Sequence, residues 1–447
     1  MEITVAVDPR MSTLHEFAKV TLSTPGGLRT VLDVDYSTLK VWPRVPDVAL
    51  DFFFLASVVY AIDKFVERQA TDDNWTRDLE VDLPVSRPDL WASAAKDLDL
   101  CLSFLTGDRW TFRFSSLAST LGRPRLGIPP IPLGVNRRKV GAVCLYSGGL
   151  DSLVGVIDWL ESNRDDALVL AGHHDRFVAG PFGDQRRLLD ELRPHYPNRI
   201  RTLLTQVGQE PPGGETTYRS RSLLFIALGM HAAASLEGVP LLIPENGTIA
   251  LNAPLTPSRR GSCSTRTAHP FYLETLQATL RKVGITNEIT NPLLMKTKGE
   301  VVSQCLNQDL LRKTALLSVS CAKRGHRSTW ENRSAQGCGR CMPCIYRRAA
   351  LHPVGLDVEP YGVDVCTGAV DLDATDHDVP NDFRACLSFL RLNLDRRAMA
   401  SHLMASGRLR LDDLPAYSDV VVRAMNEIRA LLGDKAIVLN STVPATS

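Results

Sequence analysis

The first part of the chain contains both strand-like and helix-like patterns of hydrophobic and polar residues. Strand-like patterns occur at residues 3–7 and 109–114, and apolar residues at helical spacing at residues 48–68 and 88–105 predict two helices. Short strands interrupted by helices are typical of a small α+β domain, which we place at residues 1–122. This part contains no cluster of catalytic residue types.

A different pattern follows residues 123–138, which carry four prolines and are typical of an extended linker. Short apolar runs at residues 140–146, 167–171 and 239–244 predict strands, and residues 151–163 and 221–236 predict helices. Strands that alternate with helices predict a parallel sheet with helices on both faces. We therefore expect an α/β domain over residues 139–350.

The last part, residues 351–447, is predicted to be a mostly helical extension. Residues 382–405 and 417–432 carry apolar positions at helical spacing, without obvious site residues. Residues 439–447 are predicted to be disordered.

Composition and charge narrow the function classes. The chain has 51 Lys and Arg against 50 Asp and Glu, so its formal net charge of +1 gives no electrostatic reason to expect a nucleic-acid or membrane partner. No apolar run is long enough to span a bilayer, and the N-terminus lacks the pattern of a secretory signal. We expect a cytoplasmic protein, whose ten cysteines stay reduced as metal ligands or free thiols.

One short string carries the strongest chemical signal. Residues 147–152 read Ser-Gly-Gly-Leu-Asp-Ser and lie between a predicted strand and a predicted helix. Gly148 and Gly149 can take positive φ angles and let backbone N–H groups approach an anion, which the positive end of the helix dipole also favours. Ser147 and Ser152 offer hydroxyl donors, and Asp151 can cap the helix or position Mg²⁺. We predict a nucleotide phosphate site; the alternative is a cluster that only turns the strand into the helix.

The cysteines form a second signal. Cys338, Cys341 and Cys344 give two consecutive C-x-x-C spacings, and Cys321 upstream supplies a fourth thiolate. Four thiolates without an open position predict a structural Zn²⁺ site. A redox C-x-x-C pair, an iron–sulfur cluster and a site in which His326 replaces Cys321 are the alternatives. Three nearby arginines are expected to offset the negative charge of such a centre: Arg340, Arg347 and Arg348.

The loop resembles the Ser-Gly-Gly-x-Asp-Ser loop of the PP-loop ATP pyrophosphatases, which cleave ATP between its α and β phosphates. No Gly-Lys-Ser/Thr follows it, so it is not a Walker loop. Together with Ser320-Cys321 and the Cys-Gly-x-Cys-x-x-Cys string before Arg347, it resembles the 7-cyano-7-deazaguanine synthase (QueC) family. The resemblance covers about residues 139–350 and includes the stretches at 219–224 and 291–300.

This resemblance implies a PP-loop (HUP-like, adenine nucleotide alpha hydrolase-like) fold that uses ATP and Mg²⁺ to adenylate a carboxylate. It implies catalytic roles for Ser147, Asp151, Ser152 and Lys298. The residues expected to bind the nucleotide are Tyr146, Ser147, Gly148, Gly149, Leu150, Asp151, Ser152, Gly172, His173, Arg219, Arg221 and Lys296. The metal ligands implied are Cys321, Cys338, Cys341 and Cys344. A 7-deazaguanine-type acid would be the substrate, and an amine would attack it to give an amide or a nitrile.

The chain also departs from the family. Residues 246–252 and 264–271 stand where family members carry a substrate-contacting stretch, so the substrate pocket is expected to differ. The long layout resembles QueC-like proteins of bacterial anti-phage systems, such as QatC of the Qat system. Defence proteins are therefore candidate partners, a protein amine is a possible acceptor, and a homodimer is possible.

Two other functions compete with this interpretation. The chain could be another PP-loop enzyme, such as a tRNA-modifying enzyme. It could also bind ATP without turnover, as a scaffold or sensor in a defence complex.

Overall fold

The computed structural model describes residues 1–8, 17–39, 42, 45–122, 139–178, 180–215, 219–236, 238–256, 266–366 and 381–435. The predicted linker at 123–138 and the predicted disordered end at 439–447 lie outside these residues. Within the described ranges, none of the helices has the length and apolar character needed to cross a membrane.

The chain forms two compact units, each built from several segments. The first comprises residues 1–147, 159–244 and 265–292, and the second comprises residues 148–158, 245–264 and 293–447. The predicted domain boundaries at 122, 138 and 350 stay a prediction.

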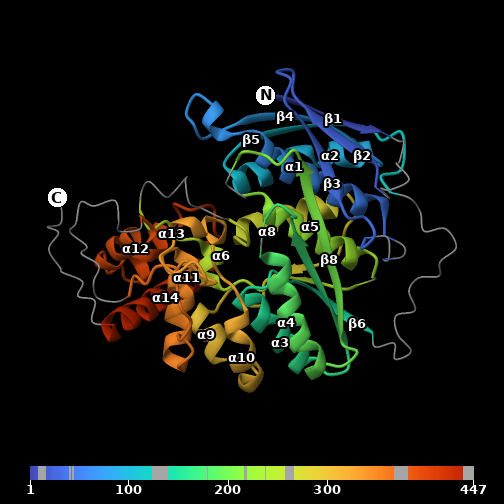
Figure 1. Ribbon diagram of the computed structural model, residues 1–447. Helices are drawn as coiled ribbons and strands as arrows, with labels where there is room; N and C mark the ends of the chain where they lie inside the picture. Colours follow the sequence, from blue (N-terminus) through green and yellow to red (C-terminus); the bar gives the residue numbers. More distant parts are fainter. Residues whose placement is uncertain are drawn as a thin grey trace. The chain divides into compact units, whose positions relative to one another are not determined.

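A ten-stranded sheet forms the centre of the first unit (Figure 1). Its strands lie in the order β10-β9-β6-β7-β8-β3-β2-β1-β4-β5. Their bounds are β1 Glu2–Asp8, β2 Lys19–Ser23, β3 Arg29–Val34, β4 Asp78–Val85, β5 Arg109–Ser116, β6 Val140–Leu145, β7 Ala167–His174, β8 Ile200–Glu210, β9 Leu241–Leu242 and β10 Ile289–Thr290. The sheet and its helices confirm the α/β class.

The parallel half of the sheet runs from β10 to β8. Numbered along the chain from β6, its order is 3-2-1-4-5, as in doubly wound folds. Every residue of β7 except His174 is buried, so both faces of this strand are covered. Helices α4 (Pro181–His195) and α5 (Arg221–Ala234) pack against β7. The predicted strand at 239–244 is only two residues long.

The N-terminal strands extend the same sheet. Val31 to Val34 of β3 pair antiparallel with Val207 to Glu210 of β8, which joins the two halves. Helices α1 (Asp47–Phe65) and α2 (Pro88–Thr106) belong to this half. Helix α1 is buried almost all round, including Phe52, Phe53 and Phe54, because it packs against both the sheet and α5. The described strands of the N-terminal α+β segment thus all belong to this one sheet.

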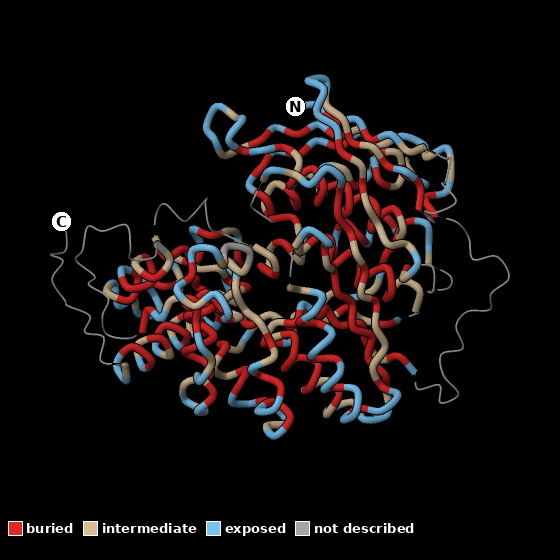
Figure 2. The backbone as a smooth tube through the Cα atoms, viewed as in Figure 1, coloured by how far each residue is buried: buried red, intermediate tan, exposed pale blue. Residues whose placement is uncertain are grey.

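The second unit is helical. Its described helices include α6 (Gly247–Leu251), α9 (Lys298–Ser303), α10 (Gln308–Thr314), α11 (Met342–Leu351), α12 (Asn381–Arg391), α13 (Arg396–Leu403) and α14 (Leu414–Asp434). Its hydrophobic core is formed by residues of α6, α11 and the three C-terminal helices, and buried residues are red in Figure 2. The expected helix at 382–405 is two helices, because Asn393 takes a φ angle of 45° and Asp395 caps a new start.

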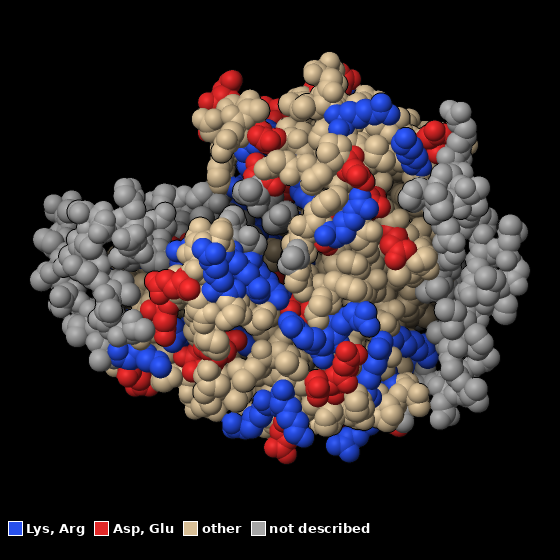
Figure 3. Space-filling view, viewed as in Figure 1, with Lys and Arg blue, Asp and Glu red and all other residues tan. Residues whose placement is uncertain are grey.

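On the molecular face drawn in Figure 3, basic and acidic side chains are interspersed over the described residues. This mixture agrees with the formal net charge of +1.

Candidate functional site

The glycine loop occupies the connection between β6 and α3. Strand β6 ends at Leu145 and α3 (Leu150–Ser162) begins five residues later. Gly148 has a φ angle of 82°, in the left-handed region that glycine adopts without strain. The Ser152 hydroxyl donates to the Gly149 carbonyl oxygen at 2.9 Å. The predicted strand–loop–helix arrangement is therefore present, and it leads directly into the first turn of α3.

Both carboxylate oxygens of Asp151, in that first turn, have partners. Lys298 Nζ lies 2.6 Å from Oδ1, and Asn246 Nδ2 donates to Oδ2 at 2.8 Å. Lys298 and Asn246 are buried, whereas Asp151 is half-buried. A negative group in the first turn is favoured by the helix dipole. The structure thus brings together two predicted site residues, Asp151 and Lys298, and adds Asn246.

Each partner of Asp151 stands at the start of a short helix. Asn246 is the N-cap of α6, and its Oδ1 accepts from the N–H of Ile249 at 3.2 Å. Lys298 is the first residue of α9, whose N-cap Thr297 forms a capping box with Glu300. These caps define the backbone position of both side chains. Because the caps hold the backbone, Asn246 and Lys298 reach Asp151 from defined positions although both are distant from it in the sequence.

The segment before Cys321 runs beside the glycine loop. Val319 N–H donates to the Gly148 carbonyl oxygen at 3.0 Å, and Leu150 N–H donates to Ser320 Oγ at 3.3 Å. Leu150 is the first residue of α3, so Ser320 satisfies one of the N–H groups that lack a partner within the helix. Val319 and Ser320, which directly precede Cys321, therefore link the cysteine cluster to the loop.

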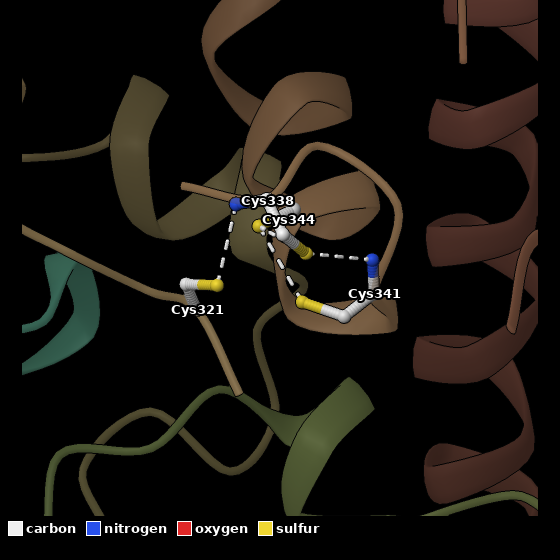
Figure 4. A group of neighbouring side chains, drawn as sticks. All are labelled: Cys321, Cys338, Cys341 and Cys344. Carbon is white, nitrogen blue, oxygen red and sulfur yellow. Dashed lines mark hydrogen bonds between the residues drawn. The ribbon is translucent and has the colours of Figure 1, made fainter. Parts of the chain in front are cut away.

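Figure 4 shows the four cysteines converging on one point. Their four Sγ atoms lie within 4.8 Å of one another. The Sγ atom of Cys344 is 3.9 Å from that of Cys338 and 3.4 Å from that of Cys341. In a tetrahedral centre with Zn–S bonds of about 2.3 Å, sulfurs lie ~3.8 Å apart. The arrangement is compatible with zinc bound by Cys321, Cys338, Cys341 and Cys344.

Backbone N–H groups favour negative charge on two of the four sulfurs, those of Cys321 and Cys338. Cys338 N–H donates to Cys321 Sγ and Cys341 N–H donates to Cys338 Sγ, both at 3.3 Å. Hydrogen bonds with the neighbouring thiols, Cys321 first, hold the pKa of Cys338 far below its usual range and raise the pKa of Cys341 and of Cys344 well above it. Thiolates are the form that binds a metal.

The turn that carries the cysteines requires glycine at position 339. Gly339 has a φ angle of 78°, and a Cβ atom there would lie 2.1 Å from the Val363 carbonyl oxygen.

The arginines expected to offset the thiolate charge have other partners. Arg347 pairs with Glu359, Arg348 pairs with Asp357 and Asp364, and Arg340 donates to Thr329. Two of the three are thus paired with carboxylates, which reduces the charge they can lend the cluster.

The remaining predicted residues lie in several places. Tyr146 is buried, and its hydroxyl donates to the Gln185 carbonyl oxygen, whereas Ser147 is exposed. Gly172 and His173 belong to β7, where the His173 ring contacts the Val207 carbonyl oxygen at 2.8 Å. Lys296 is half-buried, and its carbonyl oxygen accepts from Gly247 N–H.

The two candidate arginines belong to the first unit. Arg219 Nη1 donates to the Thr106 carbonyl oxygen at 2.7 Å, and its guanidinium lies 4.0 Å from the Trp75 ring centre. Burial lowers the pKa of Arg219 to about 10. The Arg221 guanidinium lies 5.2 Å from the Phe225 ring centre. The roles of both arginines toward a nucleotide stay predictions.

Sequence reasoning placed Asn246 in the stretch expected to alter the substrate pocket and Ser320 in the Ser-Cys string, but it predicted no contact of Asn246 with Asp151 or of the Ser320 hydroxyl with Leu150. The order Asn-Gly-Thr-Ile-Ala contains an N-cap signal for a short helix at residue 246. Nothing local indicates that the Asn246 side chain meets a carboxylate 95 residues earlier.

In comparisons with known proteins, no protein-family model and no curated protein matches this chain.

Proposed function

We propose that this chain activates a carboxylate by adenylation with ATP, releasing pyrophosphate. The observation that carries the proposal is the group Asp151, Lys298 and Asn246 at the first turn of α3, directly after the glycine loop. A buried cation next to a loop with a left-handed glycine is suited to binding phosphate oxygens. The resemblance of residues 147–152 to a pyrophosphate-binding loop supplies the reaction class.

In the proposed reaction a carboxylate oxygen of the substrate attacks the α-phosphorus of ATP. The bond between that phosphorus and the bridging oxygen to the β-phosphorus breaks, and pyrophosphate leaves with the electron pair. An amine then attacks the acyl carbon, and AMP leaves. Lys298, Ser147 and Ser152 would bind phosphate oxygens, and Asp151 would orient Lys298. Mg²⁺, when bound, would neutralise phosphate charge.

The cysteine cluster would hold zinc in a structural role. Four thiolates fill a tetrahedral site, so no position is left for substrate or water. Through Ser320, the cluster would brace the start of α3. The substrate class, a 7-deazaguanine carboxylate, and a place in an anti-phage system are proposed on the resemblance alone.

The test is a product analysis with ATP, Mg²⁺, 7-carboxy-7-deazaguanine and ammonia. We expect AMP and pyrophosphate in equal amounts, with loss of both in Ser152→Ala and Lys298→Met. Lys313→Met, at an exposed position on α10, is the matched control and should retain turnover. Release of ADP and phosphate would contradict the proposal. ATP binding without any turnover would favour the scaffold alternative.

The amine acceptor needs a second measurement. If the acceptor is a protein amine, mass spectrometry of partner proteins from the same operon should show a covalent mass increase that needs ATP and substrate. Unmodified partners together with a free nitrile or amide product would assign ammonia as the acceptor.

A further inference from the structure

One face of α14 contacts the starts of the two helices that hold the partners of Asp151. Val420, Arg423 and Glu427 recur at helical spacing, so they share this face. A Cβ atom at Gly247, the first residue of α6, would lie 2.9 Å from Val420 Cγ1. The other two side chains meet the first turn of α9. The C-terminal extension therefore packs directly against the starts of α6 and α9, where Asn246 and Lys298 stand.

Glu427 binds the residues on both sides of Lys298. One carboxylate oxygen accepts from the Thr297 hydroxyl, and the other accepts from the Gly299 N–H at 3.1 Å. A Cβ atom at Gly299 would lie 2.5 Å from Glu427 Oε1, so the close approach depends on glycine there. Burial raises the pKa of Glu427. A carboxylate at the N-terminal end of a helix is nevertheless electrostatically favoured.

Arg423 reinforces the same contact from one helical turn away. Its Nε lies 2.6 Å from Glu300 Oε1, and its Nη2 donates to the Met295 carbonyl oxygen at 3.1 Å. Glu300 is the capping-box partner of Thr297. The first turn of α9 is therefore held by two side chains of α14 as well as by its own capping box.

We propose that Glu427 is a positioning residue, which fixes Thr297 and Gly299 so that Lys298 Nζ meets Asp151. A lysine carries several rotatable bonds, so the direction of its side chain is defined only if its backbone is held and its head group is paired. The phosphate role of Lys298 rests on the proposed function, whereas the positioning of Lys298 rests on these contacts alone. The C-terminal extension thus has a role in the candidate site.

The first experiment needs no turnover. Trace acetylation of the intact protein, with mass spectrometry of each lysine peptide, reports how often Lys298 leaves its buried ion pair. We expect Glu427→Leu to raise the labelling rate of Lys298 about 10-fold relative to exposed Lys313, since leucine can accept from neither donor. Asn426→Ala, at an exposed neighbouring position of α14, is the matched control and should leave the rate unchanged.

A second variant separates positioning from general damage. In Gly299→Ala the new methyl group pushes the Glu427 carboxylate away, while alanine favours the helix more than glycine. We expect the same selective rise at Lys298 with an unchanged thermal transition. An unchanged Lys298 rate in both variants would overturn the proposal, and so would an equal rise at every lysine in both.

Turnover supplies the third measurement. If the chain releases pyrophosphate, Glu427→Leu should lower kcat about 10-fold and change KM for ATP little, because a misplaced cation costs transition-state stabilisation. Added to Lys298→Met, the substitution should cause no further loss of the residual turnover, since both act through one side chain. Additive losses would contradict positioning through Lys298. Absence of turnover in the unmodified protein would instead count against the proposed function, and the labelling result would still stand.

Discussion

Lys298 and Asp151 form an ion pair that is largely withdrawn from solvent. The distance between Nζ and Oδ1 is 2.6 Å, and the side chains are 4% and 13% exposed. Because removing two charges from water is costly, such a pair is weak evidence for a role in stability alone. Under the proposed function, the pair would hold a cation in a defined place beside the glycine loop.

We first predict that breaking this ion pair destabilises the protein more than replacing it. Asp151→Asn leaves the buried Lys298 without its partner charge, so the unfolding free energy should fall by about 3 kcal/mol. The double variant Asp151→Asn with Lys298→Met should recover most of that loss. Urea denaturation of the two single variants and the double variant measures the coupling. If the losses of the single variants simply add, the pair makes no net interaction.

A second prediction concerns the metal. The purified protein should contain about one zinc ion per chain, and Cys338→Ser should lose most of it, since a site with three thiolates binds more weakly. Because Ser320 lies next to Cys321 and accepts from Leu150 N–H, zinc removal should speed hydrogen exchange at the start of α3. Metal analysis and exchange mass spectrometry check both statements. Iron in place of zinc, or unchanged exchange after chelation, would contradict them.

The third prediction compares two glycines that both have left-handed φ angles. At Gly355, with φ of 71° and no atom near a new Cβ, alanine should cost only the conformational strain of about 1 kcal/mol. At Gly339 the Cβ atom would also lie 2.1 Å from a backbone oxygen, so alanine should cost more than about 3 kcal/mol. Thermal denaturation and zinc content are the measurements. Equal losses would mean that the close approach at Gly339 is relieved at little cost.

Fourth, acid should destabilise the first unit through three buried histidines. Burial lowers the pKa of His173 and of His269 to about 3 and that of His231 to about 4. These rings stay neutral in the fold and take up protons on unfolding below pH 6.5, so their contribution to stability is present above that pH and is lost as the pH falls. As the pH falls through this range, each histidine lowers the unfolding free energy by about 1.4 kcal/mol per pH unit, and the three together lower it by about 4 kcal/mol per pH unit.

The fourth prediction is tested by measuring the unfolding free energy at several pH values between 7 and 5 and taking its slope against pH. His231→Leu should reduce the histidine contribution to the pH slope by about a third, since one of the three groups is removed. His195→Gln, at an exposed position, should not change the slope. A slope that is insensitive to His231→Leu would mean that this ring is not held neutral.

The sequence alone predicted the features that depend on residues close together in the chain. The glycine pair before a helix and the two C-x-x-C spacings specify their turns and ligands within a few residues, so residues 147–152 and the cysteine cluster were recognisable. Buried strands such as β7 and long helices such as α1 were predicted because their apolar patterns repeat over many residues.

Only the tertiary structure decided which distant segments meet. The pairing of β3 with β8 uses backbone groups, which carry no information about residue type, so the continuous sheet could not be predicted from the sequence. Asn246 and Lys298 reach Asp151 across 95 and 147 residues, and Glu427 reaches Thr297 across 130. Such contacts follow from helix packing and caps, and a single asparagine or glutamate in the sequence is equally compatible with a solvated surface position.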